Sequence, residues 1–148
     1  MTPYASLTEA FTYFSERYDN QLWLSSEDTI RTRALKTATR LIDRLNFLDD
    51  KTEAEQENEF PRGTDTDVPD DVKNACCEIA YALLDGRDPD FESEFNNASA
   101  LSIGSVKLSK DIESVPLHVW YNIPSSIAWS YLTPYMVNPH ELRIERVS

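Results

Sequence analysis

Glycine, cysteine and histidine are scarce in this chain, and each shortage excludes a class of site. The 148 residues include three glycines, two cysteines and two histidines. Three glycines, at positions 63, 86 and 104, cannot build the glycine-rich loops that bind phosphates, and we expect no cofactor. His118 and His140 have no cysteine or carboxylate cluster around them at ligand spacing, so we expect no metal site.

Catalytic motifs are missing as well. The chain has no G-x-S-x-G motif, and Ser125 and Ser126 precede an expected helix, where capping accounts for them. Acidic residues are abundant, but they lie in polar segments without the apolar setting that separates the pKa values of a catalytic pair. We therefore expect no catalytic residues and no enzymatic activity.

Long apolar runs are also absent. No stretch approaches the 18 consecutive apolar residues of a membrane-spanning helix, so no membrane partner is expected. The first residues, MTPYASLTEAF, lack the basic and apolar regions of a secretory signal. Cys76 and Cys77 are adjacent, and side chains about 100° apart on a helix make a poor disulfide. Such cysteine usage favours a reducing compartment.

Basic residues are outnumbered, 14 to 26, which gives a formal net charge of -12. Such a surface repels a phosphate backbone and argues against tight, non-specific binding of duplex DNA. The imbalance is local, since residues 49–71 carry two basic and ten acidic groups. This segment has no periodicity and predicts a loop, pinned to the core by Phe60. It either lines a DNA channel or is a disordered, solubilising loop.

Two amphipathic helices are expected before this loop. The first begins at Ser6, because Ser6 and Glu9 form a capping box. Its apolar stripe is Leu7, Ala10, Phe11, Phe14 and Tyr18. The second begins with Ser25 as its N-cap and carries an apolar stripe as far as Leu45. Its solvent side is basic, with Arg31, Arg33, Lys36, Arg40 and Arg44.

Two further helices are expected after the loop. Pro69 and the two aspartates that follow it predict a helix start, and Gly86 predicts its end. Pro124 starts the last helix near its first position, and Pro134 kinks or ends it. Between these helices, alternating apolar residues predict a short β-like projection at about 101–122.

The predicted fold class is therefore mainly α. We expect a single domain over residues 1–148: a small bundle of three or four helices, with its helical core at about 6–86 and 123–136. An extended C-terminal arm follows at 137–148. The predicted core residues are Phe14, Leu35, Leu41, Ile42, Val72, Cys76, Ile79 and Leu83.

Seven segments spread over nearly the whole chain also carry a family resemblance. They are YASLTEAFTYF (4–14), WL (23–24), ALKTATRLIDRL (34–45), FPR (60–62), VPDDVKNACCEIAYALLDG (68–86), IGSVKL (103–108) and IPSSIAWSYLTPY (123–135). In this order they resemble a phage protein family labelled DnaT-like single-stranded-DNA-binding. Members of that group also look like the head-to-tail connector, or adaptor, proteins of tailed phages. The resemblance implies a helical ring beneath the portal that extends the DNA channel.

On this basis we predict a structural virion protein, a head-to-tail connector that forms a homo-oligomeric, dodecameric ring. Its expected partners are the portal protein and tail or nozzle proteins, with DNA passing through without sequence-specific contact. It would lie at the head–tail interface of the virion, and in the host cytoplasm during assembly. The predicted portal contacts lie on the C-terminal arm, at Leu142, Arg143, Ile144, Arg146 and Val147. A factor that binds the portal without closing a ring is a further possibility.

The alternative prediction is a single-stranded-DNA-binding replication accessory protein. The five cations between residues 31 and 44 either contact DNA or form a solvated face that the acidic loop or a neighbouring subunit neutralises. Trp23, Trp120, Trp129 and the tyrosines either stack on bases or pack in a core or interface, which their aliphatic neighbours favour. This alternative requires the helix at 30–45 to be exposed and unpaired.

Overall fold

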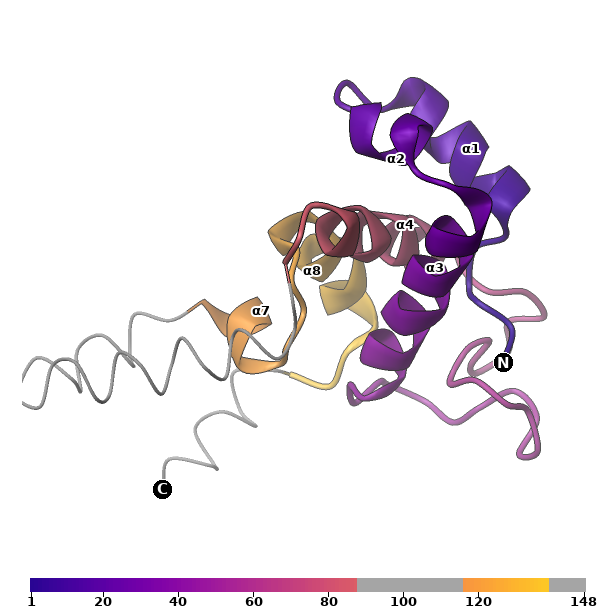
Figure 1. Ribbon diagram of the computed structural model, residues 1–148. Coiled ribbons are helices and arrows are strands. Elements are labelled where there is room, and N and C mark those ends of the chain that lie inside the picture. Colours follow the sequence, from indigo (N-terminus) through magenta and orange to yellow (C-terminus); the bar gives the residue numbers. More distant parts are fainter. Residues whose placement is uncertain (88–115, 139–148) are drawn as a thin grey trace, which may run out of the picture.

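Helices provide nearly all the regular structure of this computed structural model, which describes residues 1–87 and 116–138. The elements are α1 (Leu7–Glu16), α2 (Gln21–Ser25), α3 (Asp28–Asp43), α4 (Asp70–Leu84), α7 (Leu117–Trp120), α8 (Ser126–Leu132) and the 3₁₀ turn η1 (Thr133–Tyr135) (Figure 1). The β-structure of the described residues consists of two isolated β-bridges. The predicted mainly helical fold is confirmed. None of the described helices has both the length and the apolar character needed to cross a membrane.

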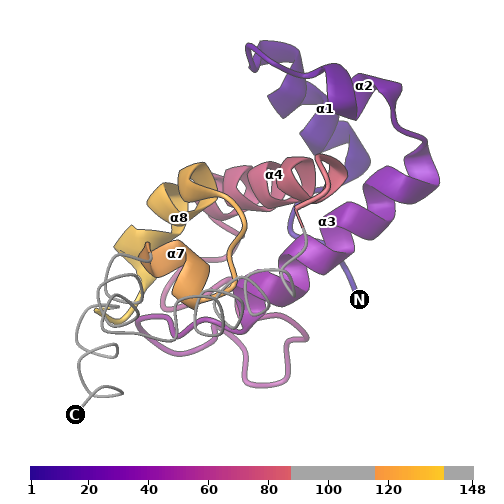
Figure 2. The same ribbon diagram turned by 60° about the vertical axis from the view of Figure 1, so that its left-hand side comes forward.

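Helix α4 is the centre of the bundle. Figure 2 shows it between α3 and α8, and its closest packing is with these two helices. Every residue from Ala75 to Ala82 is buried, so the middle of α4 is covered on all sides. Most of these side chains are alanines or cysteines, and small side chains let the neighbouring helices approach closely.

Glu78 is the one charged residue in this buried run, with 3% of its surface exposed. Arg17, which follows α1, donates from Nε (2.9 Å) and Nη2 (3.1 Å) to the two carboxylate oxygens, and the Tyr13 hydroxyl donates a further bond. The Arg17 guanidinium also lies 4.0 Å from the centre of the Tyr81 ring. A buried carboxylate needs such partners, and here they attach α1 to α4.

The predicted start of the first helix is correct, but that of the second is wrong. Ser6 Oγ accepts from the Glu9 amide (3.1 Å), and the Glu9 carboxylate accepts from the Ser6 amide (3.2 Å). Ser25, by contrast, ends α2 instead of capping α3, which begins at Asp28 after Glu27. The apolar residues around Trp23 form a helical turn of their own because Trp23 is buried against Phe14.

The ends of α4 and α8 follow the sequence signals. Pro69 is the N-cap of α4, and Gly86 lies just past its end with φ +85°, a conformation that suits glycine. The Ser125 side chain caps α8 by accepting from the Ala128 amide (3.1 Å). Helix α8 ends at Leu132, shortly before Pro134.

The predicted core residues lie at the contacts among these helices. Seven of them are buried, namely Phe14, Leu35, Leu41, Ile42, Val72, Cys76 and Ile79, whereas Leu83 is half-buried at the edge. The predicted stripe of the first helix needs a correction, because Phe11 is 38% and Tyr18 106% exposed. Ala10 and Phe14 fill the space beneath α1, and Tyr18 stands beyond the point where the helix ends.

The predicted projection is corrected over its last residues. Leu117–Trp120 form the short helix α7 instead of an extended segment, because Pro116 starts a helical turn there. The turn closes where the Ile123 amide donates to the His118 carbonyl (2.8 Å). Residues 101–115 of the projection lie outside the described residues. So do residues 139–148, with the predicted portal contacts Leu142, Arg143, Ile144, Arg146 and Val147.

Phe60 fastens the loop between α3 and α4 to the core. Its side chain is 4% exposed, and its ring makes edge contacts with Phe47, Tyr4 and Tyr135 at centroid distances of 4.6, 5.9 and 5.9 Å. The Phe60 amide also donates to the Tyr4 hydroxyl (3.1 Å). The loop is therefore tied to the N-terminal segment and to η1 at one aromatic point.

We expect Phe60→Ala to lower the free energy of unfolding by about 3–5 kcal/mol, because it removes a buried ring and leaves a cavity. Urea unfolding followed by circular dichroism measures this loss. Leu48→Ala is the control, since Leu48 is 50% exposed and its removal costs no more than about 0.5 kcal/mol. A loss from Phe60→Ala as small as that of the control contradicts the anchoring role.

Candidate functional site

The outward side of α3 carries a row of exposed basic residues: Arg33, Lys36, Arg40 and Arg44, called here the basic face. Spacings of three and four residues place them on one side of a helix with 3.6 residues per turn. Arg44 caps the helix with helical backbone angles, so it continues the row. The row extends about 16 Å along the axis. The opposite side of α3 is buried against α4.

The basic face is unpaired within residues 1–87 and 116–138. None of its four side chains makes a hydrogen bond or an ion pair in that part of the chain. The ion pairs found there involve the N-terminal amine, Arg17, Arg31, Lys51, Arg62 and Lys73. The basic face thus offers four cations on a rigid helix whose charge no described carboxylate offsets. This is the arrangement that the alternative prediction requires.

Arg31 does not belong to the basic face, which corrects the sequence prediction of five solvent-side cations. It is 8% exposed and donates to the carbonyls of Trp23 (2.8 Å) and Leu24 (2.9 Å) and to the Asp28 carboxylate (2.7 Å). The two carbonyls lie in the last turn of α2, where a helix lacks its usual donors, and the Ser26 amide also donates to the Trp23 carbonyl (3.3 Å). Arg31 therefore joins α2 to the start of α3 and is not available to a ligand.

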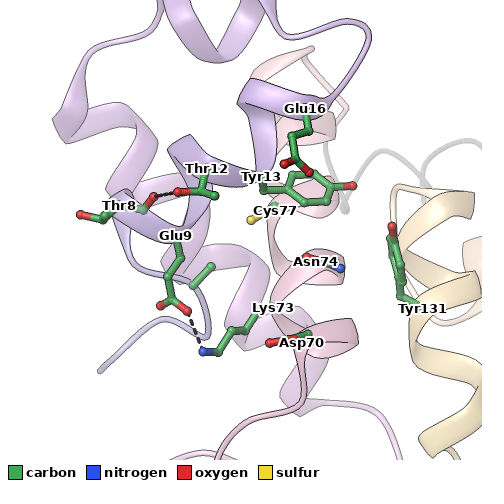
Figure 3. Close-up of a pocket in the computed structure, with 11 residues that line it drawn as sticks. Thr8, Glu9, Thr12, Tyr13, Glu16, Asp70, Lys73, Asn74, Cys77 and Tyr131 are labelled. Atoms are coloured by element: carbon green, nitrogen blue, oxygen red, sulfur yellow. Dashed lines mark hydrogen bonds and ion pairs between the residues drawn. The ribbon is translucent and has the colours of Figure 1, made fainter.

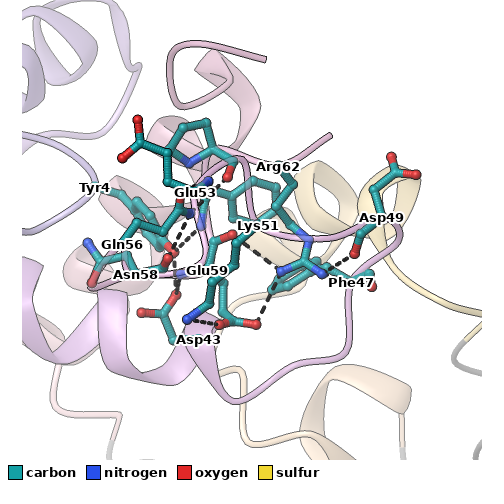
Figure 4. Close-up of polar contacts among 12 residues, drawn as sticks. Tyr4, Asp43, Phe47, Asp49, Lys51, Glu53, Gln56, Asn58, Glu59 and Arg62 are labelled. Carbon is teal, nitrogen blue, oxygen red and sulfur yellow. Dashed lines mark hydrogen bonds and ion pairs between the residues drawn. The ribbon is translucent and has the colours of Figure 1, made fainter. Parts of the chain in front are cut away.

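The acidic loop makes its ion pairs elsewhere. Figure 4 shows Glu59 between Lys51 and Arg62, at 3.2 Å from each, and Glu57 pairs with the N-terminal amine at 3.2 Å. Arg62 also donates to the Leu48 carbonyl (2.9 Å). Within the described residues, these contacts hold the loop to itself and to the N-terminus. One interpretation of the sequence was that the acidic loop neutralises the basic face, and the ion pairs of the described residues do not support it.

Two further groups of this network have shifted pKa values. Burial raises the pKa of the Asp43 carboxyl, although the bond donated by the Tyr4 hydroxyl opposes the rise. Burial and the same bond raise the pKa of Tyr4. Burial thus disfavours the charged form of the Asp43 carboxyl at the end of α3.

The cavity between α1, α4 and α8 has a volume of about 520 Å³. Figure 3 shows Glu9 and Lys73 paired across it, with their Oε2 and Nζ atoms 2.6 Å apart. Partial burial alone would raise the pKa of Glu9, but the bonds from Lys73 and Ser6 lower it. Burial raises the pKa of the Cys77 thiol in the cavity wall and that of Cys76 to about 11. These thiols are therefore protonated and poor nucleophiles.

Nothing in that cavity pairs a nucleophile with a base. Burial and the bond to Glu78 raise the pKa of the Tyr13 hydroxyl, which keeps it protonated. In the part of the chain that the structure describes, no group of three histidine, cysteine or acidic side chains is placed to hold a metal ion. The basic face is therefore the better candidate site.

Comparison with known proteins gives one finding. The model of the family described as "Putative DnaT-like ssDNA binding protein" matches residues 2–113. Neither a curated protein nor a solved structure matches the chain. The matched residues include α1 to α4 and with them the basic face.

This match corrects the main functional prediction. The connector role, the dodecameric ring, and the portal and tail partners were wrong, because the matching family is described as DnaT-like and ssDNA-binding and not as a structural connector. The finding favours the alternative prediction. The net charge was a poor guide, because it averages over an acidic loop whose ion pairs, among the described residues, are with Lys51, Arg62 and the N-terminal amine and not with the basic face.

We expect Arg31→Ala to destabilise the protein by about 2–4 kcal/mol, because it leaves the Trp23 and Leu24 carbonyls without their charged donor. Arg40→Ala, on the same helix, should change the free energy of unfolding by no more than about 0.5 kcal/mol. Urea unfolding of both variants measures the difference. Equal losses would show that the two arginines do not divide into a structural and a free class.

Proposed function

The chain belongs to the DnaT-like ssDNA-binding protein family, and from that premise we propose that it binds single-stranded DNA through the basic face of α3. The observation that supports this most strongly is the unpaired row Arg33, Lys36, Arg40 and Arg44. The protein acts by binding alone, without catalysis. A second candidate function has no comparable support.

The row is suited to a phosphate backbone. Each cation that meets a phosphate releases counterions from the strand, and this release drives the association independently of base sequence. Three of the four residues are arginines, whose planar guanidinium groups contact phosphate oxygens with two parallel hydrogen bonds. The helix is backed by the core, so little order has to be gained on binding.

The net charge of -12 is compatible with this function because the excess is local. Residues 1–48 carry six basic and six acidic groups, whereas residues 49–71 carry two and ten. In physiological salt, charges separated by more than about 8 Å of water are largely screened from one another. A strand on the basic face therefore responds first to the cations it touches. The acidic surplus limits the affinity and discourages unspecific accumulation of DNA.

We expect a labelled oligothymidylate of about 16 nucleotides, the upper site size of one single-strand-binding domain, to bind in a salt-dependent way. If four phosphates are neutralised, the logarithm of the association constant falls against that of salt with a slope of about -3. Fluorescence anisotropy from about 50 to 200 mM salt measures this slope. A wild-type protein that does not bind the oligonucleotide contradicts the proposal.

Charge reversal on the basic face is the second part of this test. Arg40→Glu should weaken binding at least about fivefold and make the slope shallower by about 0.7, the value of one phosphate contact. Arg87→Glu is the control, because it makes the same change of net charge just past α4, away from the basic face; since Arg87 donates to the Pro124 carbonyl (3.1 Å), circular dichroism must first show that this variant is folded. Equal weakening by both variants would show that overall charge, and not the basic face, governs binding.

A further inference from the structure

The cavity between α1, α4 and α8 lies apart from the basic face. Figure 2 shows α3 and α8 on opposite sides of α4, so α4 separates the cavity from the outward side of α3. The cavity volume of about 520 Å³ falls within the range of about 300–1,000 Å³ that is usual for ligand sites. A ligand in this cavity would therefore leave the basic face free.

Two tyrosine rings form fixed walls of the cavity. The Tyr13 hydroxyl donates to the buried Glu78 carboxylate, and the Tyr13 ring meets Phe14 edge to face at 5.2 Å. Tyr131 packs against the core from α8. Figure 3 shows Tyr131 across the cavity from Tyr13, and the Asn74 side chain of α4 points into the space beside it. Asn74 makes no hydrogen bond through its amide within the described residues, so the cavity offers aromatic faces and a polar group that a ligand can use.

The charge of the lining is negative. Three carboxylates, of Glu9, Glu16 and Asp70, face a single ammonium group, that of Lys73. Glu9 and Lys73 offset each other at 2.6 Å. Glu16 and Asp70 are exposed, and neither carboxylate has an ion pair or a hydrogen bond in residues 1–87 and 116–138. The cavity therefore has two carboxylates in excess, and it disfavours a ligand that carries phosphate.

A second cavity continues this acidic surface. It has a volume of about 490 Å³, and it shares Asp70 with the first cavity. Its lining adds two further exposed carboxylates, Asp65 and Asp67, which also have no ion pair among the described residues. The two cavities together are elongated, and this shape suits an extended ligand with more than one positive charge.

We propose that the cavity between α1, α4 and α8 binds an arginine side chain of a basic, extended segment of a protein partner. A planar guanidinium group stacks on a tyrosine ring and at the same time donates hydrogen bonds to carboxylates. Arg17 of this chain makes this pair of contacts itself, with Glu78 and with the Tyr81 ring. A second arginine of the segment would lie near Asp65 and Asp67. The inference does not depend on the proposed function, because the two sites are separate.

The test uses a labelled, end-capped peptide with the sequence Gly-Arg-Gly-Arg-Gly, measured by fluorescence anisotropy in physiological salt. We expect the wild type to bind it, and we expect the double variant Glu16→Gln with Asp70→Asn to bind at least about fivefold more weakly. Glu53→Gln with Glu55→Gln is the matched control. It makes the same change of net charge at two exposed residues of the loop that do not line the cavity, and should leave the affinity unchanged.

The aromatic part of the proposal is tested with the corresponding lysine peptide. It should bind the wild type about threefold more weakly than the arginine peptide, because an ammonium group stacks less well on a ring. Tyr131→Leu should remove this difference, whereas Tyr131→Phe, which keeps the ring, should retain it. Urea unfolding shows whether both variants are folded, and a folded Tyr131→Leu protein that still prefers arginine overturns the stacking role.

The other outcomes are equally distinct. A wild type that does not bind the peptide overturns the proposal, and so does equal weakening by the two double variants, since overall charge would then govern binding. Displacement of the peptide by an equal concentration of spermidine would assign the cavity to small polyamines instead. A dimer in analytical ultracentrifugation that Arg40→Glu abolishes would place a second copy's basic face on the acidic surface and would also overturn the proposal. Oligothymidylate binding, measured with the same variants, reports separately on the proposed function and should not change when the cavity is altered.

Discussion

The burial of one carboxylate, Glu78, determines how the N-terminal half of the chain is arranged. A charge inside α4 is tolerated only with good partners, and Arg17 and Tyr13 supply them from α1 and its end. Once α1 is held there, Phe14 meets Trp23 of α2. The carbonyl at Trp23 then binds Arg31 of α3. A chain of contacts therefore runs from the centre of α4 to the start of the helix that carries the basic face.

The arginines of this half divide into two classes with different energetics. Arg17 and Arg31 are tied to named acceptors and contribute to the fold. The side chains of the basic face make no such bonds within the described residues. Like charges four residues apart, such as Lys36 and Arg40, destabilise a helix by a few tenths of a kcal/mol per pair. A row of such residues without described partners is a small cost to the fold, and a phosphate backbone is the kind of ligand that offsets it.

The sequence predicted the helical fold, the Ser6 capping box and the ends of α4 because those features are local. It did not predict α2, since a five-residue helix that rests on the burial of Trp23 has no periodicity of its own. Arg31 was grouped with the exposed cations, although its spacing from Leu35 puts it on the core side of α3. Arginines are seldom buried, and only the carbonyls at the end of α2 explain this one. Phe11 was assigned to the core stripe because its spacing fits the apolar side of the first helix, but it is 38% exposed in the structure.

Exposed acidic residues flank the basic face at both ends, and they bear on the proposed binding of a strand. Beyond Arg44 the chain enters the acidic loop, where Asp49 and Asp50 are exposed and repel phosphates. Before Arg33, Glu27 and Asp28 are exposed, and Arg31 at 2.7 Å offsets the charge of Asp28. Repulsion at both ends would keep a strand that bound as proposed to the four cations between them. If the proposed function holds, the acidic residues restrict where a strand can lie, because screening in physiological salt limits their repulsion to a range of about 8 Å.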